Sequence, residues 1–148
     1  LTSVTISSTV KKLSSMVFYN CSSLESITIP DSVTQISSGV FYNCQKLATV
    51  ILSKNISRLQ TNCFYNCSML KDIVIPENVM EIGIGCFSYC TALNTVSVKS
   101  VTPPTLSDYI FDDCSNLSKI YVPSASQYEY QNGSYWSRYK SLMVGKIF

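Results

Sequence analysis

A repeat of about 23 residues runs through most of this sequence, and it limits the folds that the chain can adopt. Each unit carries a phenylalanine, a cysteine three residues later and a leucine three residues after that, at intervals of 23, 23, 23 and 24 residues. Self-similarity at a fixed period of about 20–50 residues is typical of a solenoid, in which each unit packs on its neighbours. The repeated residues are Phe18, Phe41, Phe64, Phe87 and Phe111; Cys21, Cys44, Cys67, Cys90 and Cys114; and Leu24, Leu47, Leu70, Leu93 and Leu117.

The segment around and after each leucine is predicted to hold a strand. Its apolar residues alternate with other residues, as in a strand with one buried face. Pro30 and Pro76 follow two of these segments and lack the N–H group that would extend the hydrogen-bond ladder. Because the same strand recurs in the same direction one coil later, the strands must pair as a parallel sheet. The six predicted strands are TSVTI, ESITI, ATVIL, KDIVI, NTVSV and SKIYV.

The Phe-x-x-Cys-x-x-Leu segments are predicted to form short helices on the other side of each coil. Their three-residue spacing keeps one face of a helical turn pointing inward, with Ser37 and Ser38 as N-caps before Val40. The predicted fold class is therefore an α/β repeat solenoid. The first coil is truncated, because Leu1 and Val4 fall part-way through a unit, and further repeats or domains are expected upstream in the parent protein.

Residues 124–148 abandon the period and are predicted to be a C-terminal helical cap on repeats 1–123. Two pairs with the spacing of a capping box predict a helix that begins near Ala125. The pairs are Ser124 with Gln127 and Ser126 with Glu129. After a break at Asn132-Gly133, a second helical piece would carry the apolar face that closes the last coil. That face would consist of Trp136, Tyr139 and either Leu142 or Met143.

Composition and charge disfavour several classes of function. The 11 basic and 9 acidic residues are scattered, without the basic stripe that a nucleic acid would require. No apolar stretch approaches the roughly 18–20 residues of a transmembrane segment. Histidine is absent, which removes the commonest general base and the commonest zinc ligand. We expect no nucleic-acid partner, no transmembrane segment within this chain and no cofactor.

The seven cysteines allow a functional and a structural interpretation. CFYNC (63–67) and CFSYC (86–90) place thiols four residues apart, a spacing that could hold a soft metal or form a redox pair. The first cysteine of each pair, however, stands where earlier units carry Val17 and Val40. That exchange favours a buried thiol acting as a small apolar side chain. We expect all seven to be reduced, because parallel side chains stacked about 5 Å apart are poorly oriented for a disulfide.

Two segments carry the resemblance of this sequence to a known family. VFYNCSSLESITIPDSVTQI (17–36) and CFYNCSMLKDIVIPENVMEI (63–82) resemble the leucine-rich repeats of BspA-like cell-surface proteins of bacteria and some protists. The pattern departs at Ser53, where proline is expected, and at Pro103-Pro104, where a unit gains one residue. The resemblance implies a right-handed, curved coil with the parallel sheet on its concave face, short helices on its convex face and a location at the cell surface or outside the cell.

The outward-facing strand positions are the predicted ligand-binding residues. Open sheet faces carry recognition in solenoids, and exposed apolar or aromatic groups such as Ile51, Val74 and Tyr121 favour contact points. A solvated, threonine-rich face selected only for β-propensity is the alternative. The candidates are Ser26, Thr28, Thr49, Ile51, Asp72, Val74, Thr95, Ser97, Lys119 and Tyr121.

Three hypotheses for function remain open at this point. The first is a non-catalytic module that binds a protein or glycan, and the resemblance implies adhesion to a host or neighbouring-cell surface. The second is a structural spacer that displays another domain. The third is an enzyme that uses a thiol, or a carboxylate pair such as Asp72 with Asp31 or Glu77. It is disfavoured because these acids lie in different coils without convergence.

Overall fold

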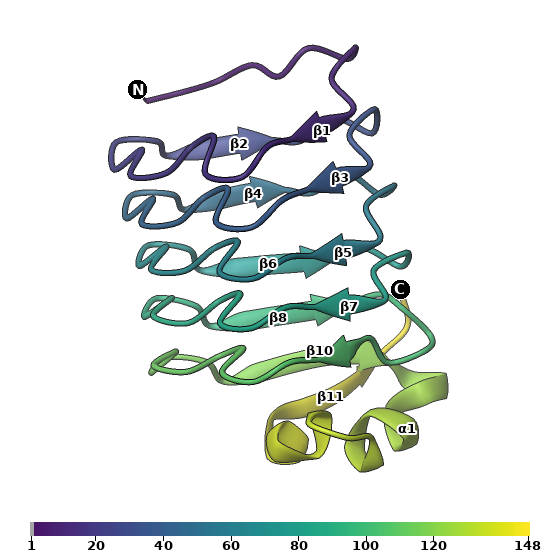
Figure 1. Cartoon of the computed structure of the whole chain (residues 1–148). Helices are drawn as coiled ribbons and strands as arrows, with labels where there is room; N and C mark the ends of the chain where they lie inside the picture. Colours follow the sequence, from purple (N-terminus) through teal and green to yellow (C-terminus); the bar gives the residue numbers. More distant parts are fainter. Residues whose placement is uncertain (1) are drawn as a thin grey trace.

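The computed structural model describes residues 2–148 and shows a stack of coils that ends in a small helical cap (Figure 1). One side of the stack carries short parallel strands, each from a different coil. Paired strands are offset by one repeat, as in Ser26 with Thr49 and Asp72 with Thr95. The leucine-rich-repeat solenoid and its parallel sheet are thus confirmed. The strands of this front side are β2 (Ser26–Thr28), β4 (Thr49–Ile51), β6 (Asp72–Ile75), β8 (Thr95–Val98) and β10 (Lys119–Pro123).

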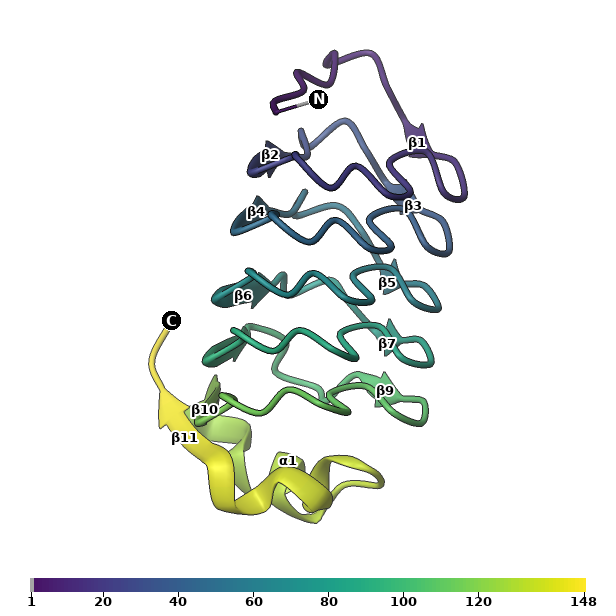
Figure 2. The same ribbon diagram turned by 90° about the vertical axis from the view of Figure 1, so that its left-hand side faces the viewer.

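A second column of strands, which the sequence did not lead us to predict, lies on another side of each coil (Figure 2). Each has two residues, of which the first is exposed or half-exposed and the second is buried. Alternation cannot be recognised in so short a segment, although the buried Ile36 and Leu59 belong to the apolar repeat. The strands of this back side are β1 (Lys12–Leu13), β3 (Gln35–Ile36), β5 (Arg58–Leu59), β7 (Glu81–Ile82) and β9 (Thr105–Leu106).

The short helices predicted for the convex side are not present, because the Phe-x-x-Cys segments form turns. Within residues 2–148, helices occur only in the cap. In the second complete unit the N–H of Cys44 bonds the carbonyl of Phe41, as in a tight turn, but the N–H of Phe41 donates to the next coil. Gly39 and Asn43 have φ angles of 63° and 61°. Left-handed residues at these places interrupt a right-handed helix, so Ser37 and Ser38 have no helix to cap.

A column of stacked rings marks the centre of the core. The five repeat phenylalanines stack with centroids 5.2–5.6 Å apart, and Phe41, Phe64 and Phe87 are fully buried. The repeat leucines Leu24, Leu47, Leu70 and Leu93 are fully buried as well. Burial of this apolar surface, repeated in every coil, is the main favourable contribution to folding.

The C-terminal segment covers the last coil. It contains the 3₁₀ helices η1 (Ser124–Ser126) and η2 (Trp136–Leu142), the helix α1 (Gln127–Asn132) and the strand β11 (Met143–Lys146), which extends the front sheet beside β10. Trp136 is buried, and its indole N–H donates to the carbonyl of Pro104 at 2.7 Å. The predicted capping boxes are wrong, because neither η1 nor α1 has a side-chain hydrogen bond at its N-cap.

Both sheets are interrupted at neighbouring places in the stack. In the back sheet β3 pairs with β1 but not with β5, and in the front sheet β4 pairs with β2 but not with β6. At other levels of the front sheet one carbonyl accepts two N–H groups from the next coil, as Glu25 does from Ala48 and Thr49. Within residues 2–148 no backbone hydrogen bond of this kind joins segment 48–52 to segment 71–75, or segment 34–37 to segment 57–60. We call these two interruptions the seam.

Candidate ligand-binding face

The ten predicted binding residues form two parallel rows on the front sheet, which we call the strand face. Strand pairing aligns equivalent positions, so that Ser97 lies beside both Val74 and Tyr121. Seven of the ten side chains are exposed, and Thr95, Ser97 and Tyr121 are partly exposed. Ser26, Thr49, Asp72, Thr95 and Lys119 form one row, and Thr28, Ile51, Val74, Ser97 and Tyr121 form the other.

A hollow of about 380 Å³ lies on this face where the front sheet is interrupted. Ile51 on β4 is 57% exposed and Val74 on β6 is 46% exposed, and both side chains line the hollow. Exposed apolar groups gathered in a depression are more typical of a binding surface than of a solvated sheet face. The hollow is lined by Val50, Ile51, Leu52, Lys54, Val74, Pro76, Glu77 and Lys99.

Three charged residues line the hollow, and sequence reasoning did not predict them as ligand-binding residues. Lys54, Glu77 and Lys99 follow the ends of β4, β6 and β8. Glu77 was considered only as part of a carboxylate pair, and the only signal for a binding role was the position of the three residues in the loops after the strands. Lys54 forms an ion pair with Asp31 at 3.0 Å. Its backbone N–H also donates to the Asp31 carboxylate, and this hydrogen bond lowers the pKa of that carboxyl group. Among residues 2–148, the ion pairs include neither Glu77 nor Lys99.

The two ends of the strand face differ from its centre. At the capped end the Lys146 ammonium of β11 lies 5.1 Å from the ring centroid of Tyr121, so this aromatic residue is partly covered. In the other row the hydroxyl of Thr95 hydrogen-bonds the carboxylate of Asp72. The structure therefore brings Ile51 and Val74 together at one depression, whereas Ser26 and Thr28 lie on the other side of β4 from it.

The features proposed for catalysis do not assemble into a site. Asp31 is paired with Lys54. Asp72 and Glu77 belong to the same coil, contrary to the expectation from the sequence, but they lie respectively on β6 and in the loop after it. All seven cysteines are free, and five of them are buried. Burial raises the pKa of Cys44 to about 12, and it raises the pKa of Cys63 and Cys67 well above the ordinary range. Thiols in this environment are poorly ionised at neutral pH and are therefore weak nucleophiles.

Residues 2–148 contain neither a metal-type cluster nor a membrane-type helix. No group of three or more acidic, cysteine or histidine side chains in this range is arranged to hold a metal ion. None of its helices has the length and apolar character needed to cross a bilayer.

Comparison with protein families identifies the repeat. The model of the BspA type leucine rich repeat region matches six copies, over residues 1–118 and 87–136. The chain belongs to the BspA-type leucine-rich repeat family. Members of this family are built from leucine-rich repeats, and the family as a whole points to a non-catalytic role. A search of curated proteins gives no match.

Two solved structures resemble this BspA-type chain. The leucine rich repeat protein of T. pallidum is 30% identical and superposes with a TM-score of 0.73 over 78% of the chain. A leucine rich cell surface protein of Faecalibacterium prausnitzii A2-165 is 26% identical and superposes with a TM-score of 0.70 over 94% of the chain. The chain spans 53% of the first structure and 34% of the second.

Proposed function

We propose that this chain is a non-catalytic recognition module of a cell-surface or secreted protein, and that it mediates adhesion by binding a protein or glycan on the strand face. The observation that carries the proposal is the apolar hollow at Ile51 and Val74 within two aligned rows of exposed side chains. The similarity to a cell surface protein of F. prausnitzii supports the location. A structural spacer would not require such a hollow.

Within this proposal, the chemistry of the hollow favours a protein ligand over a neutral glycan. The hollow is lined by the apolar residues Ile51, Val74 and Pro76 and by the charged residues Glu77 and Lys99, which we call its rim. An apolar centre surrounded by charged groups is the usual composition of a protein–protein contact. A partner side chain of medium size could enter the hollow while charges of opposite sign meet the rim.

Binding can be tested with a pair of matched double variants. The variant Ile51→Ser/Val74→Ser removes two apolar side chains that line the hollow. Met80→Ser/Ile84→Ser makes the same chemical change at residues that are 64% and 50% exposed but lie outside the strand face. All three proteins would be screened against immobilised surface proteins and a glycan array, and their folding would be compared by circular dichroism.

We expect the screen to find a ligand with equal affinity for the wild type and for the control variant Met80→Ser/Ile84→Ser. Its affinity for Ile51→Ser/Val74→Ser should be at least tenfold lower. Equal binding by both variants would contradict the assignment of the site. Absence of any ligand for the folded wild type would favour the spacer.

A further inference from the structure

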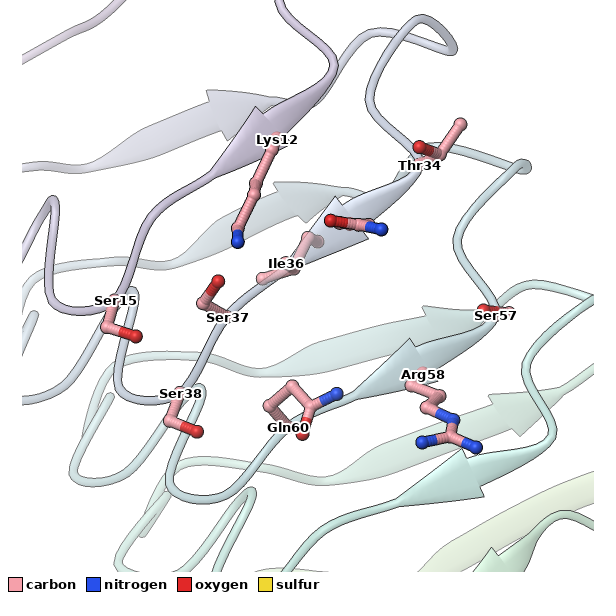
Figure 3. Close-up of a pocket in the computed structure, with 10 residues that line it drawn as sticks. Lys12, Ser15, Thr34, Ile36, Ser37, Ser38, Ser57, Arg58 and Gln60 are labelled. Atoms are coloured by element: carbon pink, nitrogen blue, oxygen red, sulfur yellow. The ribbon is translucent and has the colours of Figure 1, made fainter.

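A second pocket, of about 540 Å³, lies on the back side of the solenoid and spans the back part of the seam (Figure 3). In Figure 3 the side chain of Lys12 extends from β1 toward β3, and the side chain of Arg58 extends from β5 toward the next coil, where Glu81 lies on β7. The volume is within the range of about 300–1,000 Å³ that is typical of small-molecule sites. The pocket is separate from the strand face, because its lining comes from β1, β3, β5 and the turns next to them.

The lining of this pocket is almost entirely polar. Ile36 is its one large apolar residue, and that side chain is only 2% exposed. The other lining residues carry hydroxyl, amide or cationic groups. They are Lys12, Ser15, Thr34, Gln35, Ser37, Ser38, Ser57, Arg58 and Gln60. Such a surface suits a ligand that forms many hydrogen bonds.

The seam adds backbone groups to this polar surface. At the neighbouring levels of the back sheet, Thr34 N–H donates to the Lys11 carbonyl at 3.0 Å and Met80 N–H donates to the Ser57 carbonyl at 2.9 Å. The equivalent bond from Ser57 N–H to the Thr34 carbonyl is missing. The same comparison shows that the bond from Gln60 N–H to the Ile36 carbonyl is missing, whereas Gly83 N–H does bond the Leu59 carbonyl.

These free groups restrict the chemistry of a ligand. Backbone N–H and C=O groups must be satisfied by water or by another molecule, and here both donors and acceptors are free. A fully deprotonated inorganic anion such as sulfate could accept from the Ser57 and Gln60 N–H groups, but it could not donate to the Thr34 and Ile36 carbonyls. Sugar hydroxyls can do both, as can the serine and glutamine side chains around them.

Two cations set the expected charge of the ligand. Lys12 forms no ion pair with another residue in the range 2–148. Arg58 contacts Glu81 through its Nε at 3.3 Å, and this arrangement leaves the terminal guanidinium nitrogens available. A carboxylate accepts charge-assisted hydrogen bonds from both kinds of side chain. We propose that this pocket, which we call the back pocket, binds a short acidic oligosaccharide whose carboxylate groups are bound by Lys12 on the β1 side of the pocket and by Arg58 on the β5 side.

The test is a titration of the ¹⁵N-labelled protein, followed by NMR, with acidic and neutral sugars. Trigalacturonate and 3′-sialyllactose present a carboxylate as part of a uronic acid and of a sialic acid, respectively. The trimethyl ester of trigalacturonate is the neutral control of the same size. We expect saturable shifts of the Ser57 and Gln60 amide signals with at least one acidic sugar, and at least tenfold weaker binding of the ester.

Three variants test the assigned roles. Lys12→Gln/Arg58→Gln should weaken binding of the acidic sugar at least tenfold, whereas Lys54→Gln/Lys99→Gln on the strand face should leave it unchanged. Glu81→Gln should strengthen binding several-fold, because it removes the carboxylate that competes for Arg58. These predictions do not depend on a ligand of the strand face.

Four outcomes would overturn the proposal: no saturable shift with either acidic sugar, equal binding of the ester, equal binding by Lys12→Gln/Arg58→Gln, or full competition by an equal concentration of inorganic phosphate. Circular dichroism of each variant separates a loss of binding from a loss of folding.

Discussion

At the scale of single residues, four of the five repeat cysteines fill volume and also form a hydrogen bond. The Sγ atoms of Cys44, Cys67, Cys90 and Cys114 lie 3.1–3.2 Å from the carbonyl oxygens of Phe18, Phe41, Phe64 and Phe87, one coil earlier. Cys63 and Cys86 instead occupy the position of Val40 and are fully buried. The sequence therefore correctly indicated a structural role, but the periodic cysteines also satisfy a carbonyl group as weak S–H donors.

The buried thiols predict a loss of stability at alkaline pH. Burial raises the pKa of Cys44 from its ordinary 9.0 to about 12 and raises the pKa of Cys67 and Cys90 as well, so the folded state keeps protons that the unfolded state releases. The contribution of these buried thiols to stability is thus fully present below pH 9 and is lost as the pH rises toward 12. We expect the free energy of unfolding, measured in urea with a reducing agent, to fall between pH 8 and 10.5.

The variant Cys63→Val/Cys86→Val provides the control for this prediction. It introduces the residue that earlier coils carry at Val17 and Val40, and it removes two of the titrating groups. The decline with pH should be shallower in this variant. A free energy of unfolding that stays constant over the same range in the wild type would contradict the assignment.

At the scale of the repeated element, asparagines link the turns of successive coils. The side-chain amide of Asn43 donates to the side-chain oxygen of Asn20 at 2.6 Å and accepts from the amide of Asn66 at 2.6 Å. All three residues have positive φ angles of 56–61°. Asparagine tolerates this conformation better than most residues because its short side chain can form local hydrogen bonds. We call this row of side-chain hydrogen bonds between successive coils the asparagine ladder. Both the turn and the ladder thus depend on the same residue.

Two substitutions of Asn43 separate these contributions. Asn43→Gly keeps the left-handed turn and removes the ladder, so we expect a loss of about 1 kcal/mol in the free energy of unfolding. Asn43→Ala also introduces the steric cost of the left-handed conformation, about 1–2 kcal/mol, and should be the less stable variant. Urea denaturation followed by circular dichroism measures both. Equal stability of the two variants would show that the backbone conformation at Asn43 carries no cost.

Sequence reasoning succeeded for elements with several buried residues and failed for shorter ones. The front strands were predicted because residues such as Ile73 and Ile75 alternate with exposed neighbours. The helices predicted from Phe-x-x-Cys were wrong because a three-residue apolar spacing also fits successive tight turns. The ten residues of the strand face were placed correctly on the outside by alternation. Their grouping at a hollow could not be predicted, because it depends on which strands fail to pair.

At the scale of the whole molecule, the cap completes a stack that would otherwise expose a cross-section of core. Tyr130 is fully buried, and its hydroxyl donates to the Ser100 carbonyl at 2.7 Å. Its ring meets that of Trp136 edge-on, with centroids 5.1 Å apart. In a solenoid each coil is stabilised by contacts with its neighbours. Loss of the contacts made by the cap therefore destabilises the adjacent coils first.

Substitutions in the cap should therefore lower the free energy of unfolding, and the removal of a large buried side chain should cost more than the removal of one hydrogen bond. Trp136→Ala should cost about 3–5 kcal/mol by leaving a large cavity over the last coil. Tyr130→Phe should cost about 1–3 kcal/mol, because it leaves the Ser100 carbonyl unsatisfied. Tyr128→Phe is the matched control, since Tyr128 is 75% exposed. Urea denaturation would rank the three, and a Trp136→Ala variant as stable as the wild type would show that the segment does not act as a cap.

The seam also determines how the stack transmits a mechanical load. A pull along the axis of a parallel-strand solenoid is borne by the backbone bonds between successive coils. Where β3 meets β5 and where β4 meets β6, these bonds are missing, and the load passes through the turns, for example the bond from Phe41 N–H to the Cys63 carbonyl at 2.8 Å. Both proposed binding surfaces lie across this weakest boundary. A ligand that spans either surface would therefore add contacts across the seam and raise the force needed to separate the two halves of the molecule.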